Sequence, residues 1–174
     1  MAKYGLGLEK IELSDIAEDG GPGVAFTAIG NTVQGSAQLT QADGTTTDFN
    51  IEEQDDPVET VVSQKGKKTL AFSCFDVDGP TLVKFFGGTY TAYNATGPVH
   101  ASYSPNDSAS AIEKTVRLTD KKGNIFTIVR GNIAAKFNWS FTKDKLAQVD
   151  LTVDILVPTK EDTPSFSIQY PDPA

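Results

Sequence analysis

The residues most suggestive of chemistry are two aspartates, Asp76 and Asp78, which stand at alternate positions just before Gly79. Carboxylates spaced in this way begin calcium-binding loops of the EF-hand type. Such a loop also needs a third oxygen ligand before its glycine and a glutamate at its twelfth position, where this chain has Gly87. We therefore predict no metal and no cofactor here, and Asp78 is better explained as the cap of a helix.

Groups able to act as nucleophile or base are few. His100 is the only histidine, and Ser102 follows it by two residues. A Ser–His–acid mechanism needs an oriented acid and an oxyanion hole as well, and no motif for a strained nucleophile turn accompanies this pair. The only cysteine, Cys74, lies in an apolar segment and cannot form a zinc site with a single histidine. We predict that the chain is not an enzyme, although two-acid glycosidase chemistry stays open without positive support.

Charge is distributed unevenly along the chain. The net charge is −8, yet residues 11–64 hold eleven acidic residues and no lysine or arginine, whereas the chain from residue 65 onward is slightly basic. A solvated acidic surface is the simpler explanation. The alternative is electrostatic complementarity between the acidic segment of one copy and the basic side of a neighbour. Both interpretations argue against a direct grip on nucleic acid, which needs clustered lysine and arginine.

The alternation of apolar and polar residues predicts about ten short strands. The clearest example runs from Val149 to Val157, where every second residue is apolar. The same spacing puts Phe137, Trp139 and Phe141 on one face, which we expect in the core rather than in a sugar-binding platform. Frequent strands with a single short helix predict a mainly β fold, an antiparallel β-sandwich or barrel-like sandwich.

The best-defined local structure lies between residues 66 and 88. Nearly continuous apolar sequence from Thr69 to Val77 predicts a strand that is covered on both faces. A short helix over residues 79–86 should follow, because an aspartate and a proline favour its start and two glycines favour its end. The residues that cap and stop this helix are Asp78, Pro80, Gly87 and Gly88.

A long acidic hairpin loop is predicted before this region, from Thr40 to Glu59. Asp43-Gly44 is a strong hairpin signal, since both central positions tolerate positive φ. Thr45 to Glu53 alternates like the returning strand, and Asp55-Asp56-Pro57 is expected to break it. We predict that this loop contacts another subunit through Thr40, Asp43, Gly44, Asp48, Glu52, Glu53, Asp55, Asp56 and Glu59.

At 174 residues the chain is most simply one domain. We expect an N-terminal arm and loop over residues 1–23, a β-sandwich core over 24–158 and an extended tail over 159–174. No apolar run approaches the length of a membrane-spanning helix, and the first residues lack the apolar centre of a signal peptide. We therefore expect no membrane partner.

In the order and spacing of these elements, the chain resembles the major tail tube proteins of long-tailed bacteriophages and the related tubes of contractile injection systems. The resemblance covers roughly residues 24–158, while the stretch Thr89–Tyr103 and the tail depart from it. It rests on Glu52, Asp56, Pro57 and Gly66, the strand Leu70-Ala-Phe, Asp76, Asp78, Leu82, Phe85, Gly87-Gly88, the turn Lys122-Gly123-Asn124, the strand with Ile125 and Ile128, the strand with Ala134-Ala135 and Phe141, and the strand from Leu146 to Val153 that ends at Pro158.

This resemblance implies a β-sandwich with a flanking helix that assembles into hexameric rings. The rings stack into the tail tube of a phage or prophage around a tape-measure protein, DNA passes through the lumen without specific binding, and assembly takes place in the bacterial host cytoplasm. Family members contact their neighbours through an extended hairpin loop and the N-terminal arm, and the counterpart of that loop is Thr40–Glu59. The alternative is a stand-alone binding module for carbohydrate or protein, using Tyr90, Tyr93 and Tyr103.

Overall fold

The computed structural model describes residue 5 and residues 7–96, 100–106 and 111–171. Within these residues the chain is mainly β, with antiparallel strands and one short helix, as predicted. The elements are β1 (Leu8–Ser14), β2 (Thr27–Ile29), β3 (Gln38–Gln41), β4 (Thr45–Ile51), β5 (Gln54–Gln64), β6 (Lys68–Cys74), α1 (Gly79–Phe86), β7 (Thr89–Thr91), β8 (Ser102–Ser104), β9 (Ile112–Asp120), β10 (Ile125–Asn138), β11 (Gln148–Leu156) and β12 (Phe166–Gln169).

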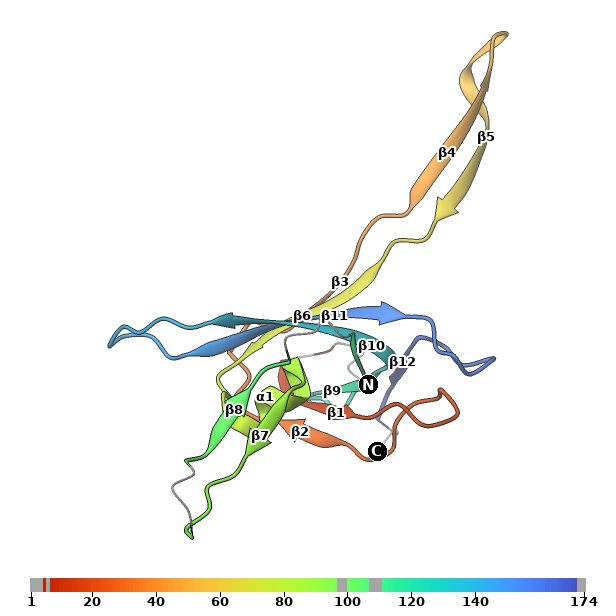
Figure 1. Cartoon of the computed structure of the whole chain (residues 1–174). Helices are drawn as coiled ribbons and strands as arrows, with labels where there is room; N and C mark the ends of the chain where they lie inside the picture. The colour runs from red at the N-terminus through yellow and green to blue at the C-terminus, as the bar shows by residue number, and fades with distance from the viewer. Residues whose placement is uncertain (1–4, 6, 97–99, 107–110, 172–174) are drawn as a thin grey trace.

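Eight strands form one antiparallel sheet in the order β2-β1-β9-β10-β11-β6-β3, and β12 pairs with β10. Strand β9 pairs with both halves of β10 along one edge, whereas the other edge pairs with β12 at residues 125–128 and with β11 at residues 130–138. The sheet curls over itself, so that β1 and β6 share one core although three strands separate them (Figure 1). This arrangement is consistent with the predicted β-sandwich.

A β-bulge in β10 marks the change from one half to the other. The pairing of β10 with β9 shifts register between Ile128 and Gly131. Within this irregular stretch, the Thr115 hydroxyl donates a hydrogen bond of 2.8 Å to the Val129 carbonyl. A Cβ added to Gly131 would lie 2.5 Å from Cγ1 of Val153, so the absence of a side chain allows β11 to approach closely.

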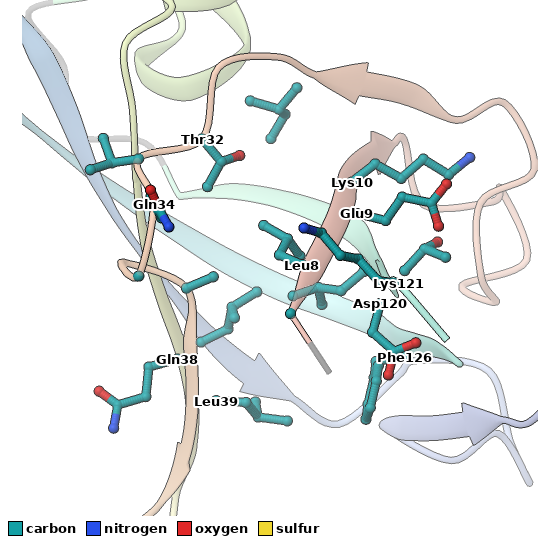
Figure 2. A pocket seen from close by; sticks show the side chains of 18 of the residues that line it. Leu8, Glu9, Lys10, Thr32, Gln34, Gln38, Leu39, Asp120, Lys121 and Phe126 are labelled. Carbon is teal, nitrogen blue, oxygen red and sulfur yellow. The ribbon is translucent and has the colours of Figure 1, made fainter. Parts of the chain in front are cut away.

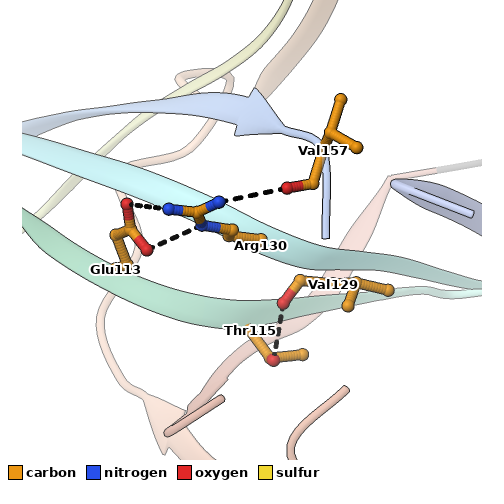
Figure 3. A network of polar contacts seen from close by, with 5 residues as sticks. All are labelled: Glu113, Thr115, Val129, Arg130 and Val157. Atoms are coloured by element: carbon orange, nitrogen blue, oxygen red, sulfur yellow. Dashed lines mark hydrogen bonds and ion pairs between the residues drawn. The ribbon is translucent and has the colours of Figure 1, made fainter. Parts of the chain in front are cut away.

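An ion pair between Arg130 and Glu113 stabilises the same irregular stretch of β10 (Figure 3). Nε and Nη2 of Arg130 donate to the two carboxylate oxygens of Glu113 at 2.7 and 2.8 Å, and Nη1 donates to the Val157 carbonyl at 3.2 Å. The hydrogen bond and charge of Arg130 hold the pKa of Glu113 below its ordinary value. Because a bidentate pair is directional, it links β9, β10 and the chain after β11 in one geometry.

The core is built from the inward faces of β1, β6, β9, β10 and β11, closed by α1. The predicted alternation along β11 is confirmed for Val149, Leu151 and Val153, which are at most 1% exposed. It is wrong for Val157, which is 79% exposed because β11 has already ended at Leu156. The buried apolar residues are Ile11, Leu13, Ile29, Leu70, Phe72, Cys74, Leu82, Phe85, Val116, Ile128, Val129, Ile133, Val149, Leu151 and Val153.

Helix α1 starts after Asp78 and stops before Gly87. The Asp78 carboxylate accepts a hydrogen bond of 3.4 Å from the Thr81 N–H, and Pro80 occupies the first turn, where its missing N–H leaves no hydrogen bond unmade. The Gly87 N–H donates to the Val83 carbonyl at 2.9 Å, and its φ of 70° lies in the left-handed region that glycine tolerates. These contacts keep the helix to two turns.

Two side chains of α1, Leu82 and Phe85, are buried against the sheet. Gly88 follows the helix with a φ of 87°, and a Cβ there would lie 2.2 Å from the Ser104 carbonyl oxygen. Glycine at this position therefore lets the chain leave the helix directly beside β8. The helix covers one end of the curled sheet (Figure 1).

Strand β6 corrects one expectation. We predicted a strand covered on both faces, but only Leu70, Phe72 and Cys74 are buried, whereas Ala71 on the opposite face is exposed. The prediction is wrong because a small residue at an exposed position made the apolar run look continuous.

Candidate functional site

The most unusual feature is a long hairpin that leaves the body of the protein (Figure 1). The chain runs outward along β3 and β4, turns at Glu52 and Glu53, and returns along β5 and β6. We call β4, β5 and the turn between them the projecting hairpin (residues 45–64). Only β3 and β6 join the main sheet, so the projecting hairpin stands outside it as a separate two-stranded sheet.

Two predictions about this hairpin are wrong. Asp43-Gly44 is not the turn but the junction between β3 and β4, where the Ala42 N–H donates to the Lys67 carbonyl and the ribbon continues outward. Asp55-Asp56-Pro57 does not break a strand, because it lies inside β5. A proline is tolerated there since an isolated pair of strands has free edges. The true turn carries two glutamates and no glycine.

Every residue of β4 and β5 is exposed, including large apolar ones. The side chains of Phe49, Ile51 and Val62 are 55, 49 and 62% exposed, and Val58 and Val61 are similar. A two-stranded sheet without a layer beneath it is only marginally stable in water. Apolar residues on such a sheet mark a surface that is complete only when a partner covers it.

The register of the projecting hairpin separates its two faces. Thr47 pairs with Val61 and Phe49 pairs with Glu59, so these four side chains share one face. Thr46 and Val62 pair on the other face, next to Asp48, whose carboxylate accepts a hydrogen bond of 2.7 Å from the Thr60 hydroxyl. Both faces therefore combine apolar and polar side chains.

The residues predicted to contact a neighbour are distributed along this ribbon from base to tip. Thr40, Asp43 and Gly44 lie at the base, Asp48 lies on β4, Glu52 and Glu53 form the turn, and Asp55, Asp56 and Glu59 lie on β5. In the described part of the chain, no lysine or arginine forms a salt bridge with these acids. The structure thus places six acidic side chains on the projecting hairpin, and none of them has a basic partner among the described residues.

A second exposed apolar surface lies at the turn between β10 and β11. Phe137, Trp139 and Phe141, which we call the aromatic ladder, are 47, 41 and 94% exposed. Their rings contact one another in sequence, with centroids 5.1 and 6.5 Å apart, and Phe86 of α1 stacks on Phe137 at 4.1 Å. The prediction that these residues belong to the core is wrong. Sequence reasoning missed this surface because the alternation of apolar residues along β10 continues beyond the part of the strand that α1 covers.

An open groove lies between β1 and the segment that leads into β3 (Figure 2). It has a volume of about 870 Å³, with Leu8, Leu39 and Phe126 among its apolar lining residues and Glu9 and Lys121 among its polar ones. Neither histidine nor cysteine lines it. The groove contains no set of groups that resembles a nucleophile, a base and an orienting acid.

The other candidates for chemistry have structural roles. Burial raises the pKa of the Cys74 thiol to about 11, so this cysteine is no nucleophile at neutral pH. The Asp76 carboxylate accepts a hydrogen bond from the Asn31 side chain, and the described residues contain no group of three or more metal-ligating side chains. His100 is exposed outside the strands.

The three tyrosines considered for a binding module are not equivalent. Tyr103 in β8 donates a hydrogen bond of 3.0 Å to the Gly87 carbonyl, and burial raises the pKa of its hydroxyl. Its cross-strand partner Tyr90 lies against Gly79, where an added Cβ would come within 2.1 Å of the ring. Both therefore hold α1 in place, and only Tyr93 is largely free, with 67% of its side chain exposed.

Comparison with known proteins adds one finding. A family model described as phage tail tube protein matches residues 14–172, which include the projecting hairpin, the aromatic ladder and the core except for most of β1. No curated protein matches the chain significantly. Among the described residues, no helix is long and apolar enough to cross a membrane.

Proposed function

Because the chain belongs to the phage tail tube protein family, we propose that it forms hexameric rings that stack into the tail tube of a phage or prophage. The family makes it a structural protein of the phage tail. The finer assignment, in which single-domain copies assemble in the host cytoplasm around a tape-measure protein and DNA passes through the lumen, is the proposal. It needs no catalytic or cofactor site.

The observation that carries the proposal is the projecting hairpin. Its strands have no layer on either face among the described residues, and its apolar residues Phe49, Ile51 and Val62 are 49 to 62% exposed. A sheet of this kind gains stability by burial against another chain, at roughly 25 cal/mol for each Å² of apolar surface removed from water. A head-to-tail contact that repeats from copy to copy gives rings when it closes and filaments when it does not.

Charge supports the same assignment. The projecting hairpin carries only acidic charges, and the chain after residue 64 holds thirteen of the fifteen lysines and arginines. Contact between the hairpin of one copy and the body of another therefore joins opposite charges. A net charge of −8 per copy also disfavours tight binding of DNA, as suits a passage through which DNA must slide.

Charge reversal at the hairpin turn tests this proposal. We expect Glu52→Lys with Glu53→Lys to abolish or shorten the tubes seen by electron microscopy of concentrated protein, with high salt weakening the unmodified assembly in the same direction. Adding Asp55→Lys and Asp56→Lys should deepen the defect. The matched control reverses Glu18 and Glu161, two exposed acids outside the hairpin. Tubes of unchanged length from the hairpin variants would contradict the assignment.

A stand-alone binding module is the competing function. It would use the exposed Tyr93 in the segment between β7 and β8. A protein that stays monomeric at high concentration and binds a glycan saturably would support this alternative instead. Sedimentation of the purified chain distinguishes the two functions before any variant is made.

A further inference from the structure

The projecting hairpin and the aromatic ladder leave the body at opposite ends of the same sheet. Strand β6 pairs with β11 from Thr69 opposite Asp154 to Cys74 opposite Val149. The hairpin continues from the first of these ends, since Lys68 pairs with Gln41 of β3. The aromatic ladder continues from the second end. In Figure 1 the hairpin rises to the upper right, and the turn between β10 and β11 reaches to the left.

The aromatic ladder continues the core-facing side of β10 beyond the part that α1 covers. In the register of β10 and β11, Ile133 pairs with Val153, Ala135 with Leu151, and Phe137 with Val149, so all these side chains share one face. That face is buried at Ile133 and becomes exposed at Phe137, where Phe86 of α1 is the last ring that covers it. The stripe then continues into Trp139 and Phe141, so an apolar surface extends beyond the helix.

The charges around the two surfaces are opposite. The turn beside the aromatic ladder carries Lys143 and Lys145 with one aspartate, Asp144, and none of these forms a salt bridge within the described residues. Leu146 in the same turn is 69% exposed and enlarges the apolar area. The charged residues of the projecting hairpin are all acidic. Both surfaces thus offer exposed apolar area, and their charges are of opposite sign.

We propose that the aromatic ladder of one copy receives the projecting hairpin of the next copy along the tube axis. This inference rests on the proposed stacking of copies and names the surface that accepts the hairpin. The face with Phe49, Ile51 and Val61 packs on Trp139 and Phe141, while the acidic turn lies near Lys143 and Lys145 of that copy.

The dimensions and directions of the two surfaces fit this contact. From the end of β3 to the turn, eleven residues of extended chain reach about 35 Å, which is comparable to the roughly 30 Å length of a nine-residue strand such as β11. The hairpin therefore reaches about as far as strand β11 is long. Because the donor and acceptor surfaces lie at opposite ends, copies in the same orientation meet head to tail, and the contact repeats without limit.

Cross-linking between two different variants tests the contact directly. One copy carries Ile51→Cys and the other carries Phe141→Cys, and the native Cys74 stays silent because it is fully buried. We expect a mixed tube treated with a short bismaleimide to yield a covalent dimer that contains one of each chain. Each variant alone should give no dimer. A matched pair of Ile51→Cys with Asn138→Cys, whose exposed side chain lies on the face of β10 opposite Phe137, should give much less.

Assembly of a single variant provides an independent test. Phe141 is 94% exposed, so Phe141→Asp leaves the fold of the free chain intact. It removes an aromatic ring and places a negative charge against an acidic hairpin, which should raise the concentration needed for tube formation by roughly tenfold or more. Thr142→Asp adds the same charge at the neighbouring exposed position and should change that concentration much less.

Several results would contradict the inference while leaving the proposed function intact. Tubes that form normally with Phe141→Asp, and tubes that give no mixed dimer, would each show that another surface accepts the hairpin. Isolated rings that give the same dimer would show that the contact lies within a ring and not between copies along the tube axis. Failure of the unmodified protein to form tubes would instead contradict the proposed function, and the inference with it. Mixed dimers confined to tubes, together with a defect specific to Phe141→Asp, support it.

Discussion

Two halves of one ribbon show how location changes the role of similar residues. Phe72 in β6 and Phe49 in β4 belong to the same long hairpin, yet Phe72 is 2% exposed and Phe49 is 55% exposed. Their strands have similar alternating sequences, but only β6 lies over a core. The apolar residues of the body hold one chain together, whereas those of the projecting hairpin remain available for contacts between chains.

The acidic residues of the two regions also differ in whether they have partners within the chain. In the body, Glu12 and Glu113 are held by Arg117 and Arg130 at 2.8 and 2.7 Å. On the projecting hairpin, the acids have no basic partner within the described chain. Electrostatics in the body therefore orders the fold, whereas electrostatics on the hairpin favours a particular partner.

The largest effect on stability should come from removing a phenylalanine ring from the body, compared with removing one from the projecting hairpin. Phe72→Ala deletes a buried ring and leaves a cavity, so we expect the free energy of unfolding to fall by about 3–5 kcal/mol. Phe49→Ala should lower it by less than about 1 kcal/mol, because its ring is already largely in water. Urea unfolding of unassembled protein measures both values. Equal losses would show that the projecting hairpin is part of the core after all.

A smaller effect should follow from neutralising one acid in each region. Burial raises the pKa of Glu12, but hydrogen bonds from Arg117 and Lys10 lower it by more, so its pKa in the folded state lies below the ordinary 4.5. Its stabilising effect is therefore present above that pH and is lost as the pH falls through and below it. Glu12→Gln should cost about 1–3 kcal/mol at pH 7 and flatten the loss of stability in acid.

Glu59→Gln on the projecting hairpin is the matched control for this change. It should leave the free energy of unfolding nearly unchanged at pH 7 and at pH 4, because Glu59 is exposed and forms no salt bridge in the described chain. Chemical unfolding at several pH values measures both variants. A Glu12→Gln protein with the acid sensitivity of the unmodified chain would contradict the role of this pair.

The comparison that disturbs the protein least is the rate of thiol labelling in the two regions. Burial raises the pKa of Cys74 to about 11, so little thiolate exists at pH 8 and the native chain should react slowly with iodoacetamide. A cysteine introduced by Thr47→Cys on the exposed hairpin should react roughly a hundredfold faster, since its pKa is near that of a free thiol. Mass spectrometry after timed labelling separates the two sites. Similar rates would show that β6 opens as readily as the hairpin.

Local sequence was enough to predict the elements whose structure depends on near neighbours. Asp78, Pro80 and Gly87 mark the ends of α1 at the residues where the structure has them. The alternation along Val149, Leu151 and Val153 predicts an inward face, and those residues are buried. In both cases the decisive interactions lie within a few residues along the chain or in the period of a strand, so the residue types alone carry the information.

Predictions failed where a distant part of the chain decides whether a face is covered. Phe137, Trp139 and Phe141 have the spacing of core residues, yet β10 extends past α1 and leaves them exposed. Asp43-Gly44 has the composition of a hairpin turn, yet pairing with the returning chain carries the ribbon through it to Glu52. Composition alone does not show at which of several possible turns the chain reverses, because that depends on how the two strands pair.

The sequence by itself determined a mainly β fold, the position of the one helix and an acidic segment without basic residues. These properties follow from residue types and their period, and they were sufficient to suggest the family. Only the tertiary structure decided that the acidic segment stands away from the body and that the aromatic ladder lies at the opposite end of the same sheet. The physical reason is that alternation shows which side chains share a face, whereas burial depends on what the rest of the chain places over that face.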